Sequence, residues 1–277
     1  MRSKTMILLS ILLGIAISSK PSEAGEVSPK QSNASPYGLS AIAPVMERAS
    51  DKASNNFQAN DLEGLQKIVN ATLTENQKVD NVNLIALNPD DLILSETSDV
   101  RIYFIGEGAG YANSLGMFTG DSADKLSGDA ALIFPNASAQ SSYLSQGGEG
   151  NRTNRAPLLS GDFVDAGTFD SGTQLNLFLI ANGANGGGTT FYSDTEQNSD
   201  GIAHFVVLAV PDSPYILVGV EDLTGGGDKD YNDVVFVMDI GRANTQQLIS
   251  NAVPLPGYMA YLIGPGLLLM LRRRKGV

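Results

Sequence analysis

The chain has 277 residues, a formal net charge of −12 and no cysteine. The lack of cysteine excludes disulfide bonds, thiolate metal sites and cysteine nucleophiles. The acidic excess disfavours nucleic acid and anionic lipid as partners and favours divalent cations. A single histidine and no tryptophan exclude a zinc site of the usual kind and disfavour strong stacking on sugar rings.

Residues 1–24 have the three parts of a secretory signal peptide. Basic Arg2 and Lys4 precede an apolar stretch over 6–17, and a small-residue exit ends at Ala24. This order predicts export with cleavage after Ala24. An uncleaved anchor is the alternative, although an apolar stretch of this length is short for a membrane span.

Residues 25–97 are predicted to form a polar leader followed by a helical segment. The leader, 25–36, is rich in serine and proline, whereas apolar residues recur at helical spacing within 37–74. This spacing predicts one or two amphipathic helices that pack on the rest of the protein. The apolar positions are Leu39, Ile42, Val45, Met46, Leu62, Leu65, Ile68 and Val69.

From residue 82 onward, short apolar runs alternate with loops rich in glycine, asparagine, aspartate and proline. Such runs predict strands. Many strands with loops between them predict a mainly β fold, an antiparallel β-sandwich of jelly-roll type over 98–241. The predicted strands are 83–87, 100–105, 130–134, 175–180, 204–210, 215–220 and 234–238, with a hairpin across 211–214.

The loop over 194–201 is rich in side-chain oxygens. Asp194, Glu196, Asn198 and Asp200 alternate before a glycine. The alternation fits a second calcium loop, and a solvated loop without metal is the alternative.

His204 follows that loop at the start of a predicted strand. No serine in the chain has the glycine-flanked motif of a hydrolase nucleophile. We therefore expect His204 to be a structural residue that bonds to a loop.

The most informative segment is 219–240, in which acidic residues surround three consecutive glycines and a β-branched strand follows. Ca²⁺ needs about six to eight oxygen ligands, so this loop predicts a calcium site. The loop lacks the glycine and the glutamate that a helix-loop-helix calcium motif has at fixed positions. Because a β-branched strand follows, we expect the loop to cap a sheet. An acidic turn without metal is the alternative. The candidate ligands are Glu221, Asp222, Asp228, Asp230, Asn232 and Asp233.

Glu107 lies in a glycine-rich turn, 106–110, directly after a predicted strand. We expect it to reach the acidic loop from a neighbouring strand as a further ligand. The turn lacks the lysine and hydroxyl residues of a phosphate-binding loop, so nucleotide binding is disfavoured.

Residues 242–277 are predicted to form a linker and a membrane tail with a short hydrophobic helix. A proline-containing segment, 253–256, precedes an apolar stretch over 257–271 and a basic cluster over 272–275. The tail resembles the PEP-CTERM class of bacterial sorting signals, with Leu255 in place of the glutamate, and implies an exosortase-like processing enzyme. A plain anchor is the alternative, although about 15 residues span only about 22 Å of a roughly 30 Å hydrocarbon core.

Three segments in fixed order carry a further resemblance. They are YFIGEGAGYANSLG over 103–116, NSDGIAH over 198–204 and EDLTGGGDKDYND over 221–233. Together they resemble a bacterial family known as domain of unknown function 4114, over about 98–241. Members of that family are typically exported, so the resemblance implies export and gives no biochemical function.

These features predict an exported cell-surface or extracellular-matrix protein that binds Ca²⁺. Residues 1–24 carry a net charge of +2, and residues 257–277 carry +4. Because the whole chain carries −12, the body between these two predicted targeting ends carries −18. We expect a structural or adhesive role in contact with exopolysaccharide or cell-surface glycan, with the membrane as a partner before the tail is processed. We expect no enzyme activity, because no complete catalytic set can be named. The alternative is a polysaccharide hydrolase with Glu107 or Glu221 as the acid of a carboxylate pair.

Overall fold

The computed structural model describes residues 25–73, 84–120, 126, 128–141, 144 and 150–252. The predicted signal peptide and the predicted hydrophobic tail lie outside these residues. Among the described residues, no helix combines the length and the apolar character needed to cross a membrane.

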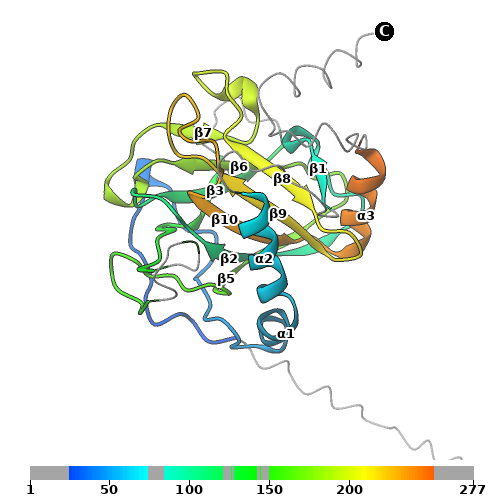
Figure 1. Cartoon of the computed structure of the whole chain (residues 1–277), viewed down its shortest axis with the longest axis horizontal. Coiled ribbons are helices and arrows are strands. Elements are labelled where there is room, and N and C mark those ends of the chain that lie inside the picture. Colours follow the sequence, from blue (N-terminus) through cyan, green and yellow to red (C-terminus); the bar gives the residue numbers. More distant parts are fainter. Residues whose placement is uncertain are drawn as a thin grey trace, which may run out of the picture.

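The described strands form two antiparallel sheets (Figure 1). The six-stranded sheet has the order β1-β8-β9-β10-β2-β5, and the four-stranded sheet has the order β4-β3-β6-β7. The mainly β, antiparallel class that the sequence predicts is therefore confirmed. The strands are β1 Ile85–Leu87, β2 Ser98–Gly106, β3 Ser114–Thr119, β4 Ala131–Phe134, β5 Phe163–Phe169, β6 Leu175–Ile180, β7 Thr190–Tyr192, β8 Phe205–Ala209, β9 Tyr215–Val220 and β10 Val234–Asp239.

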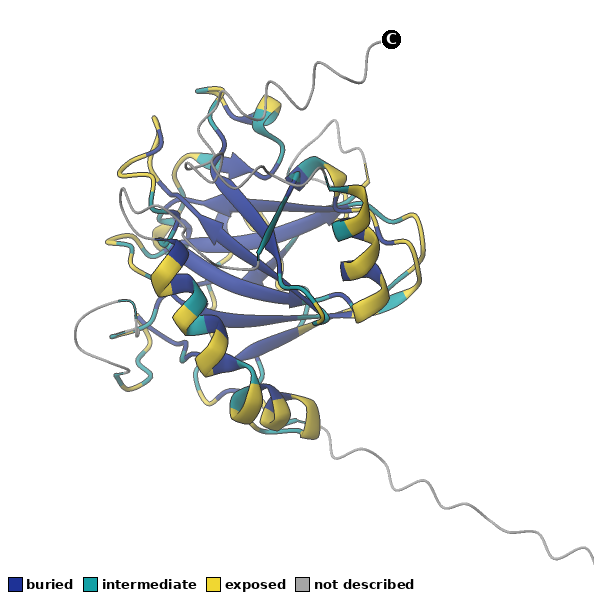
Figure 2. Ribbon diagram, turned by 45° about the vertical axis from the view of Figure 1, so that its right-hand side comes forward, coloured by how far each residue is buried: buried dark blue, intermediate teal, exposed yellow. Residues whose placement is uncertain are grey.

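One hydrophobic core takes side chains from both sheets. In β2, Val100, Ile102 and Phe104 belong to this core, whereas Tyr103 and Ile105 belong to a second cluster on the outer face of the sheet. This division follows from the two-residue period of a strand, which sends successive side chains to opposite faces. Figure 2 shows the strands of both sheets as the most buried part of the molecule.

Two of the three longer helices in the described residues cover the outer face of the six-stranded sheet. They are α1 (Lys52–Asn60) and α2 (Leu62–Thr72), and Figure 1 shows α2 lying across this sheet. Asp51 caps α1 by accepting a hydrogen bond from Ser54 N at 2.7 Å. Phe57 stacks on Tyr103 with ring centroids 3.8 Å apart. The predicted packing of amphipathic helices on the β body is confirmed.

The apolar residues between Leu39 and Met46 do not form the helix that their spacing allows. After a short 3-10 helix, Pro36–Gly38, the chain is extended and pairs with exposed strand edges. Ala41 bridges to β4 at Leu132, and Met46 bridges to β5 at Phe163. Edge strands present unpaired backbone groups, and this segment satisfies some of them.

The hairpin of β8 and β9 and the strands with long apolar runs agree with the sequence prediction. The sequence prediction missed β3, β5 and β7. β5 contains Asp165 and Gly167, and β3 contains Gly116, so neither has the continuous or alternating apolar pattern of a predicted strand. The third helix, α3 (Arg242–Asn251), lies in the predicted linker. Its buried Asn244 accepts a hydrogen bond at Oδ1 from Ser95 N, which links the helix to the loop before β2.

Candidate cation site

The acidic loop over 221–233 connects β9 to β10, at the end of the six-stranded sheet opposite α3 (Figure 1). Its backbone is sharply bent, because Gly225, Gly226 and Gly227 all have positive φ. A Cβ at Gly227 would collide with Glu221 Oε1. Glycine at this position therefore lets the loop fold back over the Glu221 carboxylate.

Five of the seven predicted ligands lie together in this loop. Glu221, Asp228 and Asp230 place carboxylate oxygens within 4.8 Å of one another, and Glu221, Asp222 and Asp233 do the same. Glu221 belongs to both groups. Its exposed fraction is 1% and that of Asp222 is 4%, whereas Asp228 is exposed. The cluster therefore has a buried base and a side open to solvent.

The carboxylates of this cluster destabilise one another's charged forms. Burial, followed by the charge of Asp222, raises the pKa of Asp233 to about 8. Burial, followed by the charge of Asp228, raises the pKa of Glu221 to about 7. Burial also raises the pKa of Asp222. In the part of the chain that the structure describes, no basic side chain forms an ion pair with Glu221, Asp222 or Asp233.

Hydrogen bonds fix three of these carboxylates. Asp222 Oδ2 accepts from Asn113 Nδ2 at 2.7 Å, and Asp233 Oδ2 accepts from Asp222 N at 2.7 Å. Glu221 Oε2 accepts from Lys229 N at 3.2 Å. Each carboxylate oxygen has two lone pairs, so these contacts leave acceptor capacity for a cation.

Asn232 supports the cluster by holding Asp230. Asn232 N donates to Asp230 Oδ1 at 3.1 Å, and its Nδ2 donates to Asp230 Oδ2 at 2.5 Å. Its backbone oxygen accepts from Gly108 N at 2.9 Å, which ties the glycine-rich turn to the acidic loop. The side-chain amide thus donates to Asp230 in this arrangement.

Glu107 lies beside the cluster and outside both carboxylate groups. Its Oε1 accepts from Ala139 N at 3.0 Å, in the connection between β4 and β5. Burial raises the pKa of Glu107 to about 7, and the charge of Asp222 contributes to the shift. Glu107 therefore contributes negative potential to the cluster from the turn that follows β2.

The second oxygen-rich loop supports the acidic loop. Asp200 Oδ2 accepts from Gly225 N at 2.9 Å and lies 3.1 Å from His204 Nε2. His204 Nδ1 lies 2.9 Å from the backbone oxygen of Glu221. Asp194 caps the 3-10 helix Thr195–Gln197. Among the described residues, neither close carboxylate group includes a member of this loop.

Sequence reasoning did not identify Asn113 and Asp200 as supports of the predicted site. Both act over long sequence separations, Asn113 on Asp222 and Asp200 on Gly225. The two pairings depend on how the strands bring the loops together. The sequence signals that pointed to these residues were the alternating oxygen-rich loop for Asp200 and, for both residues, the segments that resemble the family.

Comparison with known families gives one match. Residues 169–241 match the family model described as Domain of unknown function (DUF4114). The matched part includes the acidic loop and the loop of Asp200, and it supports the resemblance of those two segments. Glu107 and the segment 103–116 lie before it. No curated protein and no solved structure matches the chain.

Proposed function

We propose that this protein is an exported cell-surface or extracellular-matrix protein in which Ca²⁺ orders the acidic loop, with a structural or adhesive role in contact with exopolysaccharide. The observation that carries the proposal is the convergence of four carboxylates on that of Glu221, with Glu221 and Asp222 buried. A buried, unpaired carboxylate is costly. A bound cation removes the repulsion among these groups, and the loop then has one conformation.

The donor set fits calcium. Glu221, Asp222, Asp228, Asp230 and Asp233 supply oxygen ligands only, which hard cations prefer over zinc or copper. Ca²⁺ accepts six to eight oxygens in irregular arrangements, whereas Mg²⁺ demands near-octahedral geometry and retains several waters. A bent loop that offers many protein oxygens therefore favours Ca²⁺.

The architecture supports a structural role. Two antiparallel sheets with a shared core favour a jelly-roll-like β-sandwich, a rigid scaffold whose end loops are free to bind. The acidic loop lies at one such end. The predicted signal peptide and sorting tail support export, anchoring in the membrane and processing by an exosortase-like enzyme. These segments lie outside the described residues.

The same geometry gives little support to the hydrolase alternative. The two carboxylates of a glycosidase face each other across a substrate, about 5–9.5 Å apart. Glu221 instead has carboxylate oxygens of two neighbours within 4.8 Å in each of two groups. We therefore propose binding as the function of this loop and no catalysis.

Sedimentation with exopolysaccharide from the producing cells tests the adhesive role. The full chain in mild detergent is mixed with the polysaccharide in calcium or in EDTA. We expect the protein to sediment with the polysaccharide only in calcium, and the Glu221→Gln variant to stay in solution. Equal sedimentation in EDTA would contradict a calcium-ordered contact, and release of reducing sugar would support the hydrolase instead.

The stability of the calcium-free protein should depend on pH in a way set by this site. Asp233 and Glu221 have pKa values of about 8 and about 7 in the folded protein, against about 4 when unfolded. The folded protein binds these two protons more tightly than the unfolded chain does. The resulting contribution to stability is complete below the unfolded pKa and is lost as the pH rises through the pKa values of the folded protein. We expect the Tm in EDTA to fall from about pH 5 to about pH 8, and the increase produced by calcium to grow over the same range.

Glu221→Gln provides the control for this pH series. It removes one of the titrating groups and reduces the repulsion at Asp222 and Asp233, so the Tm in EDTA should change less over the same range. A parent protein that becomes more stable in EDTA as the pH rises would contradict the electrostatic account of the site.

Asp200 should affect calcium affinity without being a ligand. Asp200→Asn weakens the contacts to Gly225 and His204, and loss of such supporting contacts typically costs about tenfold or more in metal affinity. Calorimetric titration of calcium measures the change. Asp194→Asn, in the same loop, should leave the affinity unchanged. Equal affinities in Asp200→Asn and the parent would show that the support is dispensable.

A further inference from the structure

The residues that follow the predicted signal-peptide cleavage site are paired with the folded body. Val27 bridges to Met46, and Glu47 N donates to the backbone oxygen of Glu26 at 2.7 Å. Met46 in turn bridges to Phe163 of β5. An N-terminus created by that cleavage therefore begins directly beside a fixed segment.

The hydroxyl of Ser50 faces a small space beside Gly25. Ser50 Oγ is buried and has no hydrogen-bond partner among the described residues. A Cβ on Gly25 would lie 2.9 Å from this oxygen, 3.3 Å from Phe163 Cζ and 3.4 Å from Met46 Cε. A buried hydroxyl without a partner is costly, so its presence calls for a donor at this point.

The terminal nitrogen of a chain that begins at Gly25 can supply this donor. In a longer chain this nitrogen is tied to the preceding residue, whereas a terminal nitrogen turns freely about the Cα–C bond. A rotation of about 120° carries it to the point that a Cβ would occupy, because both positions are tetrahedral substituents of the same Cα. An ammonium there would lie about 2.9 Å from Ser50 Oγ, which is a normal length for an N–H···O hydrogen bond.

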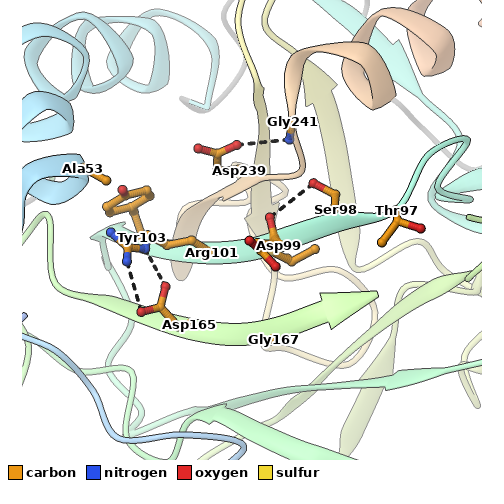
Figure 3. Close-up of a pocket in the computed structure, with 11 residues that line it drawn as sticks. Ala53, Thr97, Ser98, Asp99, Arg101, Tyr103, Asp165, Gly167, Asp239 and Gly241 are labelled. Atoms are coloured by element: carbon orange, nitrogen blue, oxygen red, sulfur yellow. Dashed lines mark hydrogen bonds and ion pairs between the residues drawn. The ribbon is translucent and has the colours of Figure 1, made fainter. Parts of the chain in front are cut away.

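The surroundings of this space accept a positive charge. The guanidinium of Arg101 already lies over the Phe163 ring, with its carbon 4.1 Å from the ring centroid. Asp51 and Asp165 both form ion pairs with Arg101, and Figure 3 shows the pair with Asp165. One cation and two carboxylates leave a net charge of −1, which attracts a further cation.

We propose that removal of the signal peptide completes the fold, because the new α-ammonium of Gly25 binds in this space and donates to Ser50 Oγ. Hydrolysis of the bond between Ala24 and Gly25 consumes one water. The oxygen of that water joins the Ala24 carbonyl carbon to give a carboxylate, and both of its protons pass to the Gly25 nitrogen to give the ammonium.

The inference rests on the proposed export, since a chain that keeps its leader has no ammonium at Gly25. The precursor keeps the Ser50 hydroxyl buried and unsatisfied, so it is less stable than the processed protein. Lower stability before processing suits a chain that crosses a membrane before it folds.

Chains that differ only at their start test the docking of the terminus. The chain from Gly25 to Val277 is compared with the full chain and with a chain that keeps Ala24 as its first residue, all in mild detergent with EDTA. We expect the Tm of the chain from Gly25 to be about 2–4 °C above that of both longer chains. Equal Tm values would overturn the proposal. Because EDTA is present throughout, this comparison does not depend on the cation site.

Ser50→Ala separates the hydrogen bond from a steric effect of the additional residue. In the chain from Gly25 it removes the acceptor of the ammonium and should lower the Tm by about 2–4 °C. In the chain from Ala24 it removes only an unsatisfied hydroxyl and should leave the Tm unchanged or raise it. Ser40→Ala changes an exposed serine of the same segment and should act equally in both chains. An equal effect of Ser50→Ala in both chains would overturn the proposal.

N-terminal sequencing of the exported protein tests the position of the cleavage. We expect the sequence to begin at Gly25. A start at any other residue would move the ammonium away from Ser50 and overturn the inference, whatever the response of the protein to calcium. A protein that begins at Gly25 and passes both stability tests would support the inference even where calcium fails to bind.

Discussion

Asp233→Asn is expected to stabilise the calcium-free protein at about pH 8 and to abolish most of its response to calcium. Asp233 Oδ2 accepts from Asp222 N, and an asparagine oxygen can replace it there. The new amide group can donate to the Glu221 carboxylate, so a repulsive contact becomes a hydrogen bond. The same change removes one charged ligand from the cluster.

The expected size of this gain follows from the pKa of Asp233, which is about 8. Such a shift in a fully buried group corresponds to several kcal/mol. Asp233 is only half-buried, so solvent screening reduces the expected gain to about 1–2 kcal/mol. That gain corresponds to an increase of about 2–8 °C in the Tm in EDTA.

Thermal unfolding in EDTA and in calcium measures both effects. At about pH 5 the gain should disappear, because Asp233 is already protonated in the folded parent protein. Asp212→Asn is the matched control, because Asp212 is exposed and lies outside the cluster. A variant that is less stable than the parent in EDTA at about pH 8 would show that the Asp233 carboxylate is not repelled there.

The largest loss of stability is expected from Arg152→Ala. Asp162 is 0% exposed, and Arg152 Nη1 and Nη2 both donate to its carboxylate. Arg48 N and Leu159 N donate to the same group at 3.1 and 2.9 Å. Removal of Arg152 leaves a buried carboxylate without a cation, which costs about 3–5 kcal/mol.

Urea unfolding measures the loss for Arg152→Ala. The double variant Arg152→Met with Asp162→Asn removes both charges and keeps an acceptor for one of the two backbone donors, so it should be more stable than Arg152→Ala. A loss below about 1 kcal/mol in the single variant would mean that water reaches Asp162 when Arg152 is removed.

Local sequence patterns predict those parts of this fold that local physics determines. β6, β8, β9 and β10 consist mostly of apolar residues, and they are correctly predicted. β5 is an edge strand with exposed polar residues and a glycine. It forms a strand because it pairs with β2, and its own sequence does not favour one. The segment around Leu39 has helical spacing but forms edge contacts, because tertiary pairing outweighs a weak propensity.

In the candidate site, too, the sequence predicts the contacts between neighbouring residues and misses those that depend on the tertiary fold. Glu221, Asp228, Asp230 and Asp233 are close in sequence, so a bent loop brings them together and the sequence predicts the cluster. Asn113 reaches Asp222 from the loop just before β3, a strand of the other sheet, and no local pattern predicts such a contact. The pairing of Arg101 in β2 with Asp239 in β10 and Asp165 in β5 likewise depends on strand register, which the sequence alone does not specify.

Calorimetric titration of calcium into the full chain in mild detergent, together with its Tm in calcium and in EDTA, is the most direct test that the acidic loop is a calcium site. We expect saturable binding by the parent and an increase in stability of about 2.7 kcal/mol at a hundred times the dissociation constant. Glu221 belongs to both carboxylate groups, so Glu221→Gln should abolish most of the binding and the increase. A parent protein that neither binds calcium nor gains stability at millimolar concentrations would contradict the account and leave the loop as an acidic turn.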